Sequence, residues 1–99
     1  MKQPPSFSLG LTVITPGALA ALGRNSSTGM EYLTRHATGD WGDLCKDDKQ
    51  ANDEAVQTGA RILSAYHLAD GTKIWIITEA EIDEKHNRQA TTIMLPEEY

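Results

Sequence analysis

The sequence predicts one α+β domain, an antiparallel sheet of about four strands with two or three short helices on one face. Strand-like segments occur near the start of the chain and within the last forty residues, and helix-like segments with capping signals lie between them. This segregation of strands from helices favours α+β over α/β. Pro4 and Pro5 resist regular structure, so we expect a disordered tail at 1–6 and the domain at 7–99.

The first strand is expected over 7–13, where apolar Phe7, Leu9, Leu11 and Val13 alternate with smaller or polar residues. A period of two is typical of a half-buried strand. A short helix should follow, because Thr15 is a favourable N-cap residue and proline is well tolerated at the next position. Gly23 is placed to end this helix, and Leu19 and Leu22 are expected to pack inward.

Two further helices are expected before the C-terminal strands. One covers 29–37 and is followed by Gly39, which suits a helix C-terminus. The other covers 48–58, where Asp47 and Gln50 have the spacing of a capping box and Gly59 supplies the stop. Its inner side should carry Ala51, Ala55 and Val56.

The last forty residues predict three strands. "ARILSAYHL" places Ile62, Ser64, Tyr66 and Leu68 on one face, and Asp70-Gly71 is a typical hairpin turn. "KIWIITE" is the most apolar run and should be a central strand, with Trp75 in the core. After the charged excursion "EAEIDEKHNRQ", "ATTIMLP" predicts the last strand, which Pro96 ends.

Composition restricts the classes of partner. The net charge is -5 and the basic residues are scattered, whereas phosphate-backbone binding usually requires a clustered basic surface, so we expect no direct nucleic-acid binding. No apolar run approaches the roughly 20 residues of a membrane helix, so no membrane contact is expected. The lone Cys45 cannot form an internal disulfide, which favours a cytoplasmic protein. An acidic chain can instead attract a basic protein.

The stretch "RHATGDWGDLCKDD" is the richest in chemical groups. His36 near Asp40 and Asp43 could perform acid–base chemistry, because the pKa of histidine lies near neutrality. The alternative is structural: a histidine suits a helix C-terminus, and aspartates suit glycine-containing turns. The spacing of the aspartates does not match an EF-hand loop, and no phosphate-binding loop, G-x-S-x-G or paired C-x-x-C occurs. We therefore expect neither a metal nor a cofactor.

Trp41 lies in the same stretch and allows two interpretations. The indole either closes the edge of the core or presents an aromatic anchor to a partner. In the second case an acidic partner-binding surface would combine the indole with neighbouring carboxylates, namely Trp41, Asp40, Asp43, Asp47 and Asp48.

Three segments carry a resemblance: "RHATGDWGDLCKDDKQANDEA", "RILSAYHLADGTKIWIITEAE" and "TTIMLPEEY". Together they resemble a family of small proteins of bacterial plasmids and integrative elements, labelled plasmid-related or type I restriction subunit M. The resemblance covers about 7–99, but this chain inserts "EIDEKHNRQA" where the family runs almost directly into its last strand. The resemblance implies a mobile-element setting and no reaction. Ninety-nine residues cannot hold a cofactor-binding methyltransferase domain.

The leading hypothesis is therefore a non-enzymatic accessory protein of a bacterial mobile element. It would bind a host or element protein through the acidic surface, with anti-restriction or anti-CRISPR activity as a specific form. One alternative is a small enzyme that uses His36 with Asp40 or Asp43. Another is a structural homodimer that pairs through a free sheet edge.

Overall fold

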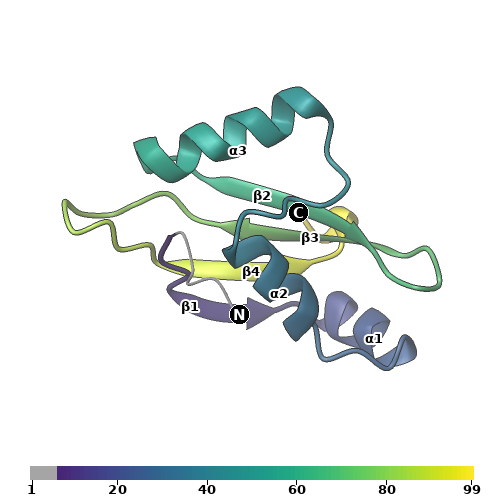
Figure 1. Cartoon of the computed structure of the whole chain (residues 1–99). Helices are drawn as coiled ribbons and strands as arrows, with labels where there is room; N and C mark the ends of the chain where they lie inside the picture. Colours follow the sequence, from purple (N-terminus) through teal and green to yellow (C-terminus); the bar gives the residue numbers. More distant parts are fainter. Residues whose placement is uncertain (1–6) are drawn as a thin grey trace.

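The structure is a computed structural model that describes residues 7–99, so the tail expected at 1–6 lies outside the described residues. The chain forms a four-stranded sheet and three α-helices, which confirms the predicted α+β class (Figure 1). The elements in chain order are β1 (Leu11–Ile14), α1 (Pro16–Arg24), α2 (Met30–Ala37), α3 (Lys46–Thr58), β2 (Ile62–His67), β3 (Lys73–Thr78), β4 (Ala90–Met94) and the 3₁₀ turn η1 (Pro96–Glu98).

The sheet is mixed, with the strand order β1-β4-β3-β2. The β2–β3 and β3–β4 pairs are antiparallel, as predicted, and the apolar β3 is a central strand. The β1–β4 pair is parallel, so the expectation of a purely antiparallel sheet is wrong. Strands β1 and β4 are joined through all three helices and two other strands, and local sequence patterns do not report the direction of so distant a pair.

The start of α1 is capped by the residue before it, Thr15, and by Glu98 of the C-terminal 3₁₀ turn. Thr15 Oγ1 accepts a hydrogen bond from the Ala18 amide, as its predicted N-cap role requires. Glu98 adds a carboxylate there, because its Oε2 accepts from the Gly17 amide and its Oε1 from the Thr15 hydroxyl. Leu22 is buried as expected, but Leu19 is 60% exposed, so its predicted inward packing is wrong.

The third helix differs from its prediction at the N-terminus. It begins at Lys46 after Cys45, whose side chain makes no capping bond, so the capping box expected at Asp47 is wrong. Gly59 ends the helix with a left-handed φ of 85°, as predicted. Asn52 and Ala55 are buried on the inner side, whereas Ala51 is exposed.

The core lies on one face of the sheet, beneath the helices (Figure 1). One cluster joins α1 to the sheet through Leu22, Tyr66, Ile76 and Ile93, and a smaller one contains Trp41, Ala55 and Ile62. Trp75, expected in the core, lies on the opposite face, where it is half-buried against the Tyr99 ring at 5.9 Å between centroids. Within residues 7–99, none of the helices has the length and apolar character needed to cross a membrane.

The outer edge of β2 is closed by the segment that precedes α3. The Ala65 amide donates to the Trp41 carbonyl at 3.2 Å, and the Asp43 amide donates to the Ala65 carbonyl at 2.7 Å. The Asn52 side chain bonds both the amide and the carbonyl of Leu63. Gly42 is required here, because it has a φ of 76° and an added Cβ would lie 2.0 Å from the Ala65 carbonyl oxygen.

Candidate functional site

Trp41 is an internal brace. Its side chain is only 4% exposed, and its Nε1 donates to Asp53 Oδ1 on α3 at 2.9 Å. The ring packs against Phe7 and His36, with centroid distances of 6.1 and 5.9 Å. The indole therefore joins α3 to the core, and the prediction that it anchors a partner is wrong.

His36 lies at the centre of a buried polar network. It is 0% exposed, with Nδ1 at 2.5 Å from Ser64 Oγ and Nε2 at 2.8 Å from Thr78 Oγ1. Thr78 is also bonded to Thr91, whose hydroxyl donates to the Leu9 carbonyl. Burial, and then the charge of Arg88, lower the pKa of His36 to about 4. The imidazole is therefore neutral at neutral pH and ties α2 to β2, β3 and β4.

Asp40 and Asp43 bind other partners on the surface. Asp40 Oδ2 accepts from Arg35 Nε at 2.7 Å, and this hydrogen bond lowers the pKa of Asp40. Asp43 pairs with the exposed His67 at 2.7 Å, which lowers the pKa of Asp43. Neither carboxylate is bonded to His36, which is sealed from solvent. The expected grouping of His36 with Asp40 and Asp43 in an enzyme site is therefore wrong.

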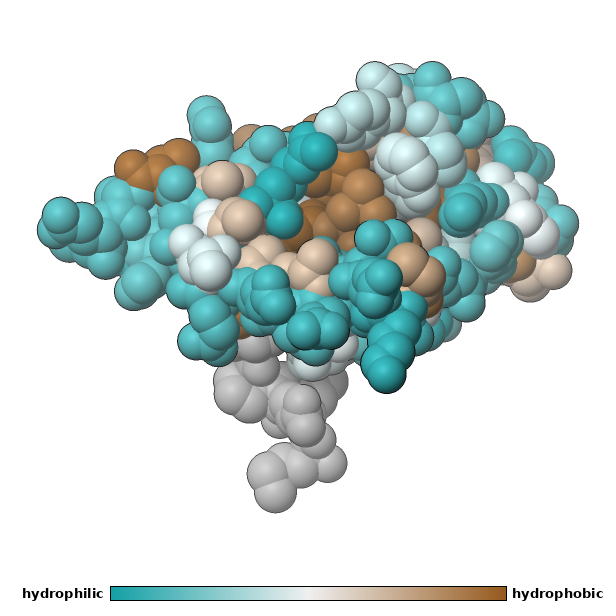
Figure 2. Space-filling model, turned by 90° about the horizontal axis from the view of Figure 1, so that it is seen from above, coloured by the Kyte–Doolittle hydropathy of each residue, from teal (hydrophilic) through white to brown (hydrophobic). Residues whose placement is uncertain are grey.

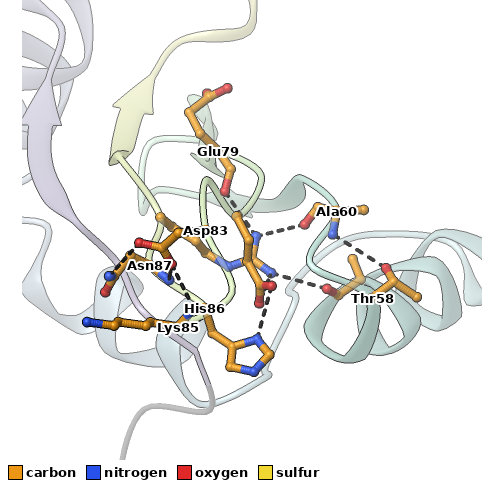
Figure 3. A network of polar contacts seen from close by, with 10 residues as sticks. Thr58, Ala60, Glu79, Asp83, Lys85, His86 and Asn87 are labelled. Carbon is orange, nitrogen blue, oxygen red and sulfur yellow. Dashed lines mark hydrogen bonds and ion pairs between the residues drawn. The ribbon is translucent and has the colours of Figure 1, made fainter.

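Arg88 is a buried cation that organises the end of α3. Its Nη1 donates to the carbonyls of Ala60 and Glu79 at 2.7 and 3.0 Å, and its Nη2 donates to the Ala55 carbonyl at 3.2 Å (Figure 3). Its Nε is buried with no hydrogen-bond partner in the described part of the chain. Burial lowers the pKa of Arg88, and the nearby Glu81 carboxylate opposes that change. Arg88 thus connects the end of α3 to Glu79, where the charged segment between β3 and β4 begins.

The charged excursion between β3 and β4 is an ordered hairpin. Glu81 faces Arg88 in an antiparallel bridge, and the Ile82 amide donates to the Asn87 carbonyl. At the turn, Asp83 accepts from the amides of Lys85 and Asn87 (Figure 3). A hollow of about 350 Å³ beside this hairpin is lined by Phe7, Ser8, Val56, Gln57, Glu81 and His86. Glu81 is already paired with His86 and Arg88, so little uncompensated charge is left there for a ligand.

A second hollow lies between α3 and the edge of β2. It encloses about 230 Å³ and is lined by Leu44, Asp48, Ala51, Asn52 and Leu63. Figure 2, which views the molecule from the side where α3 lies, shows hydrophobic side chains gathered in a depression within a largely hydrophilic face. Asp47 and Asp48 are exposed at the start of α3, and Asp48 contributes a carboxylate to the lining of the hollow. Its chemistry suits an apolar side chain next to a positive charge.

The residues expected to act together are thus only partly brought together. Asp48 lines the second hollow, and Asp47, the residue before it, is exposed at the start of α3. Trp41 is buried, and Asp40 and Asp43 are paired with Arg35 and His67. Within residues 7–99, no group of three or more histidine, cysteine or acidic side chains is placed to hold a metal ion.

Sequence reasoning missed two features of this region. The hollow combines residues from the loop before α3, the helix and β2, and no local pattern predicts that meeting. The buried network had a detectable signal, because Ser64, Thr78 and Thr91 each lie two residues from an isoleucine that faces the core, Ile62, Ile76 and Ile93. A buried hydroxyl requires a hydrogen-bond partner, and His36 supplies it for two of them.

Comparisons with protein-family models, curated proteins and solved structures found no match to this chain.

Proposed function

We propose that the protein is a non-enzymatic accessory protein of a bacterial mobile element that acts in the cytoplasm by binding another protein. The hollow lined by Leu44, Asp48, Ala51, Asn52 and Leu63 would receive an apolar side chain of the partner. This site replaces the Trp41 anchor, because the aromatic or aliphatic anchor now comes from the partner.

One observation carries the proposal: a largely apolar hollow whose lining includes the unpaired carboxylate of Asp48, next to the exposed Asp47. The first nine residues of α3 contain Asp47, Asp48, Asp53 and Glu54 against only two lysines. Asp53 is engaged by Trp41, but no hydrogen bond or ion pair engages Asp47 or Asp48 within residues 7–99. A partner segment with an apolar residue next to lysine or arginine would satisfy both features.

The mobile-element setting rests on the resemblance of "RHATGDWGD" and "IWIITEA…TTIMLPEEY" to plasmid-encoded proteins. Within that setting the partner would be a host or element protein, and a defence protein with a basic nucleic-acid-binding surface fits the charge best. The net charge of -5 supports this choice, because such surfaces are positive.

The test compares capture of host proteins by wild type and by two site variants at physiological salt. Ala51→Arg fills the hollow and offsets the negative charge of Asp48, and Asp48→Asn removes only the carboxylate. Gln50→Arg is the matched control, because it adds the same charge to the neighbouring exposed position of α3 without lining the hollow.

We expect a protein that binds wild type and Gln50→Arg but is lost with Ala51→Arg and weakened with Asp48→Asn. The proposal fails if nothing is retained above background by wild type. It also fails if all three variants retain the same proteins as wild type.

A further inference from the structure

The two edge strands of the sheet differ in whether other parts of the chain bond their outward-facing backbone groups. At β2, the backbone groups of Leu63 and Ala65 that face outward are bonded by Asn52 and by the 41–43 segment. At β1, the other edge, no described residue plays this part. An unpaired strand edge is a template for pairing with another chain, and natural proteins normally protect it.

The hydrogen bonds between β1 and β4 show which backbone N–H and C=O groups of β1 remain unpaired. The amides of Leu11 and Thr15 donate to the carbonyls of Gln89 and Ile93 in the parallel ladder with β4. Because alternate residues of a parallel strand bond to the same neighbour, the N–H and C=O groups of Thr12 and Ile14 point away from the sheet. They are unpaired within residues 7–99.

The exposed strand also lacks the usual protective residues. No charged residue and no proline occurs from 7 to 15. Leu11 is 70% exposed and Val13 is 41% exposed. Ile14 packs into the core beneath the helices, so Leu11 and Val13, which alternate with it, lie on the opposite face of the sheet.

We propose that the protein forms a homodimer in which β1 pairs antiparallel with β1 of a second copy about a two-fold axis at Val13. This register sets Thr12 opposite Ile14 of the second copy, so every outward-facing backbone group of the strand finds a partner. Val13 meets its symmetry mate at the axis, flanked on each side by Leu11. The strand is thus complementary to itself, which is the condition for a closed two-fold dimer.

The charge distribution favours this edge for self-association. A chain with a net charge of -5 repels its own copies, but β1 contributes no charge to the contact. Pairing would join two four-stranded sheets into one continuous sheet. Because the hollow borders β2 at the far edge, the dimer would carry one hollow at each end. The dimer does not depend on what the hollow binds.

Sedimentation equilibrium of the full chain tests the proposal across about a hundredfold range of concentration, because dimerisation follows mass action. We expect the mass to rise from 10.8 kDa toward twice that value. Val13→Lys sets two like charges opposite each other at the axis and should raise the dissociation constant at least about tenfold. Leu19→Lys is the control, since it makes the same kind of change at an exposed apolar residue of α1.

Thr12→Pro should also weaken the dimer, by removing a backbone hydrogen-bond donor. It removes an N–H that points outward, not one bonded to β4, so the circular dichroism spectrum should stay that of wild type. A wild-type mass of 10.8 kDa at all concentrations would overturn the proposal. So would a dimer that survives both Val13→Lys and Thr12→Pro, or one that Leu19→Lys weakens equally.

Discussion

Protonation of His36 should destabilise the fold as the pH falls from neutrality toward 4. Its pKa is lowered from 6.5 to about 4 by burial and by Arg88. Because the folded state binds this proton less well than the unfolded state, the contribution to stability is complete above about pH 6.5 and is lost as pH falls toward 4. Hydrogen bonds to Ser64 and Thr78 hold the neutral ring in place.

The magnitude follows from the displacement of the pKa. At about 1.4 kcal/mol per pKa unit, the difference between 6.5 and about 4 amounts to about 3 kcal/mol in full. Between pH 7 and pH 5, linkage gives a loss of about 2 kcal/mol, because the proton is taken up mainly by the unfolded chain in that interval.

The assay is urea unfolding of wild type, His36→Gln and His67→Gln at pH 7 and pH 5. His36→Gln should lose most of the pH dependence, whereas His67→Gln, which changes an exposed histidine on β2, should retain it. If His36→Gln does not fold, an NMR titration of the wild-type imidazoles still decides the point. A His36 that titrates near 6.5 in the folded protein would refute the reasoning, as would an equal pH dependence in both variants.

Two further substitutions test the packing that positions the site. Gly42→Ala should lower the unfolding free energy by more than about 1 kcal/mol, because its Cβ would lie 2.0 Å from the Ala65 carbonyl at a positive φ. Gly23→Ala, which has open space around it in α1, should raise the unfolding free energy by up to about 1 kcal/mol. Equal effects of the two substitutions in urea unfolding would contradict this reasoning. Arg88→Met should cost at least about 3 kcal/mol in the same assay, since the carbonyls of Ala55, Ala60 and Glu79 lose their donor, and a loss below about 1 kcal/mol would show that these bonds contribute little.

Local patterns along the chain predicted most elements and few contacts. The Thr15–Pro16 pair indicated the start of α1 and Gly59 indicated the end of α3, because capping depends on neighbouring backbone groups. The apolar run of β3 predicted a central strand, since a continuous apolar run is typical of a strand that lies between two others. The parallel β1–β4 pair escaped prediction, because its two strands are brought together by everything that lies between them.

In the candidate site, too, the residue types were informative but the contacts between them were not predicted. Residue types alone indicated that 35–48 was unusual, but His36, Asp40, Trp41 and Asp43 point in different directions once the segment crosses the edge of β2. The close approach of Gly42 to Ala65 turns the indole inward and the carboxylates outward. A one-dimensional spacing carries no information about such a crossing.

By itself, then, the amino-acid order determined the α+β class, the approximate count of strands, the start of α1 and the end of α3, because these follow from interactions between near neighbours. The tertiary structure alone decided which polar groups are buried, which edge of the sheet is open and where an apolar hollow forms. Those properties depend on contacts between residues far apart in the chain, such as Thr15 with Glu98 or Arg88 with Ala55.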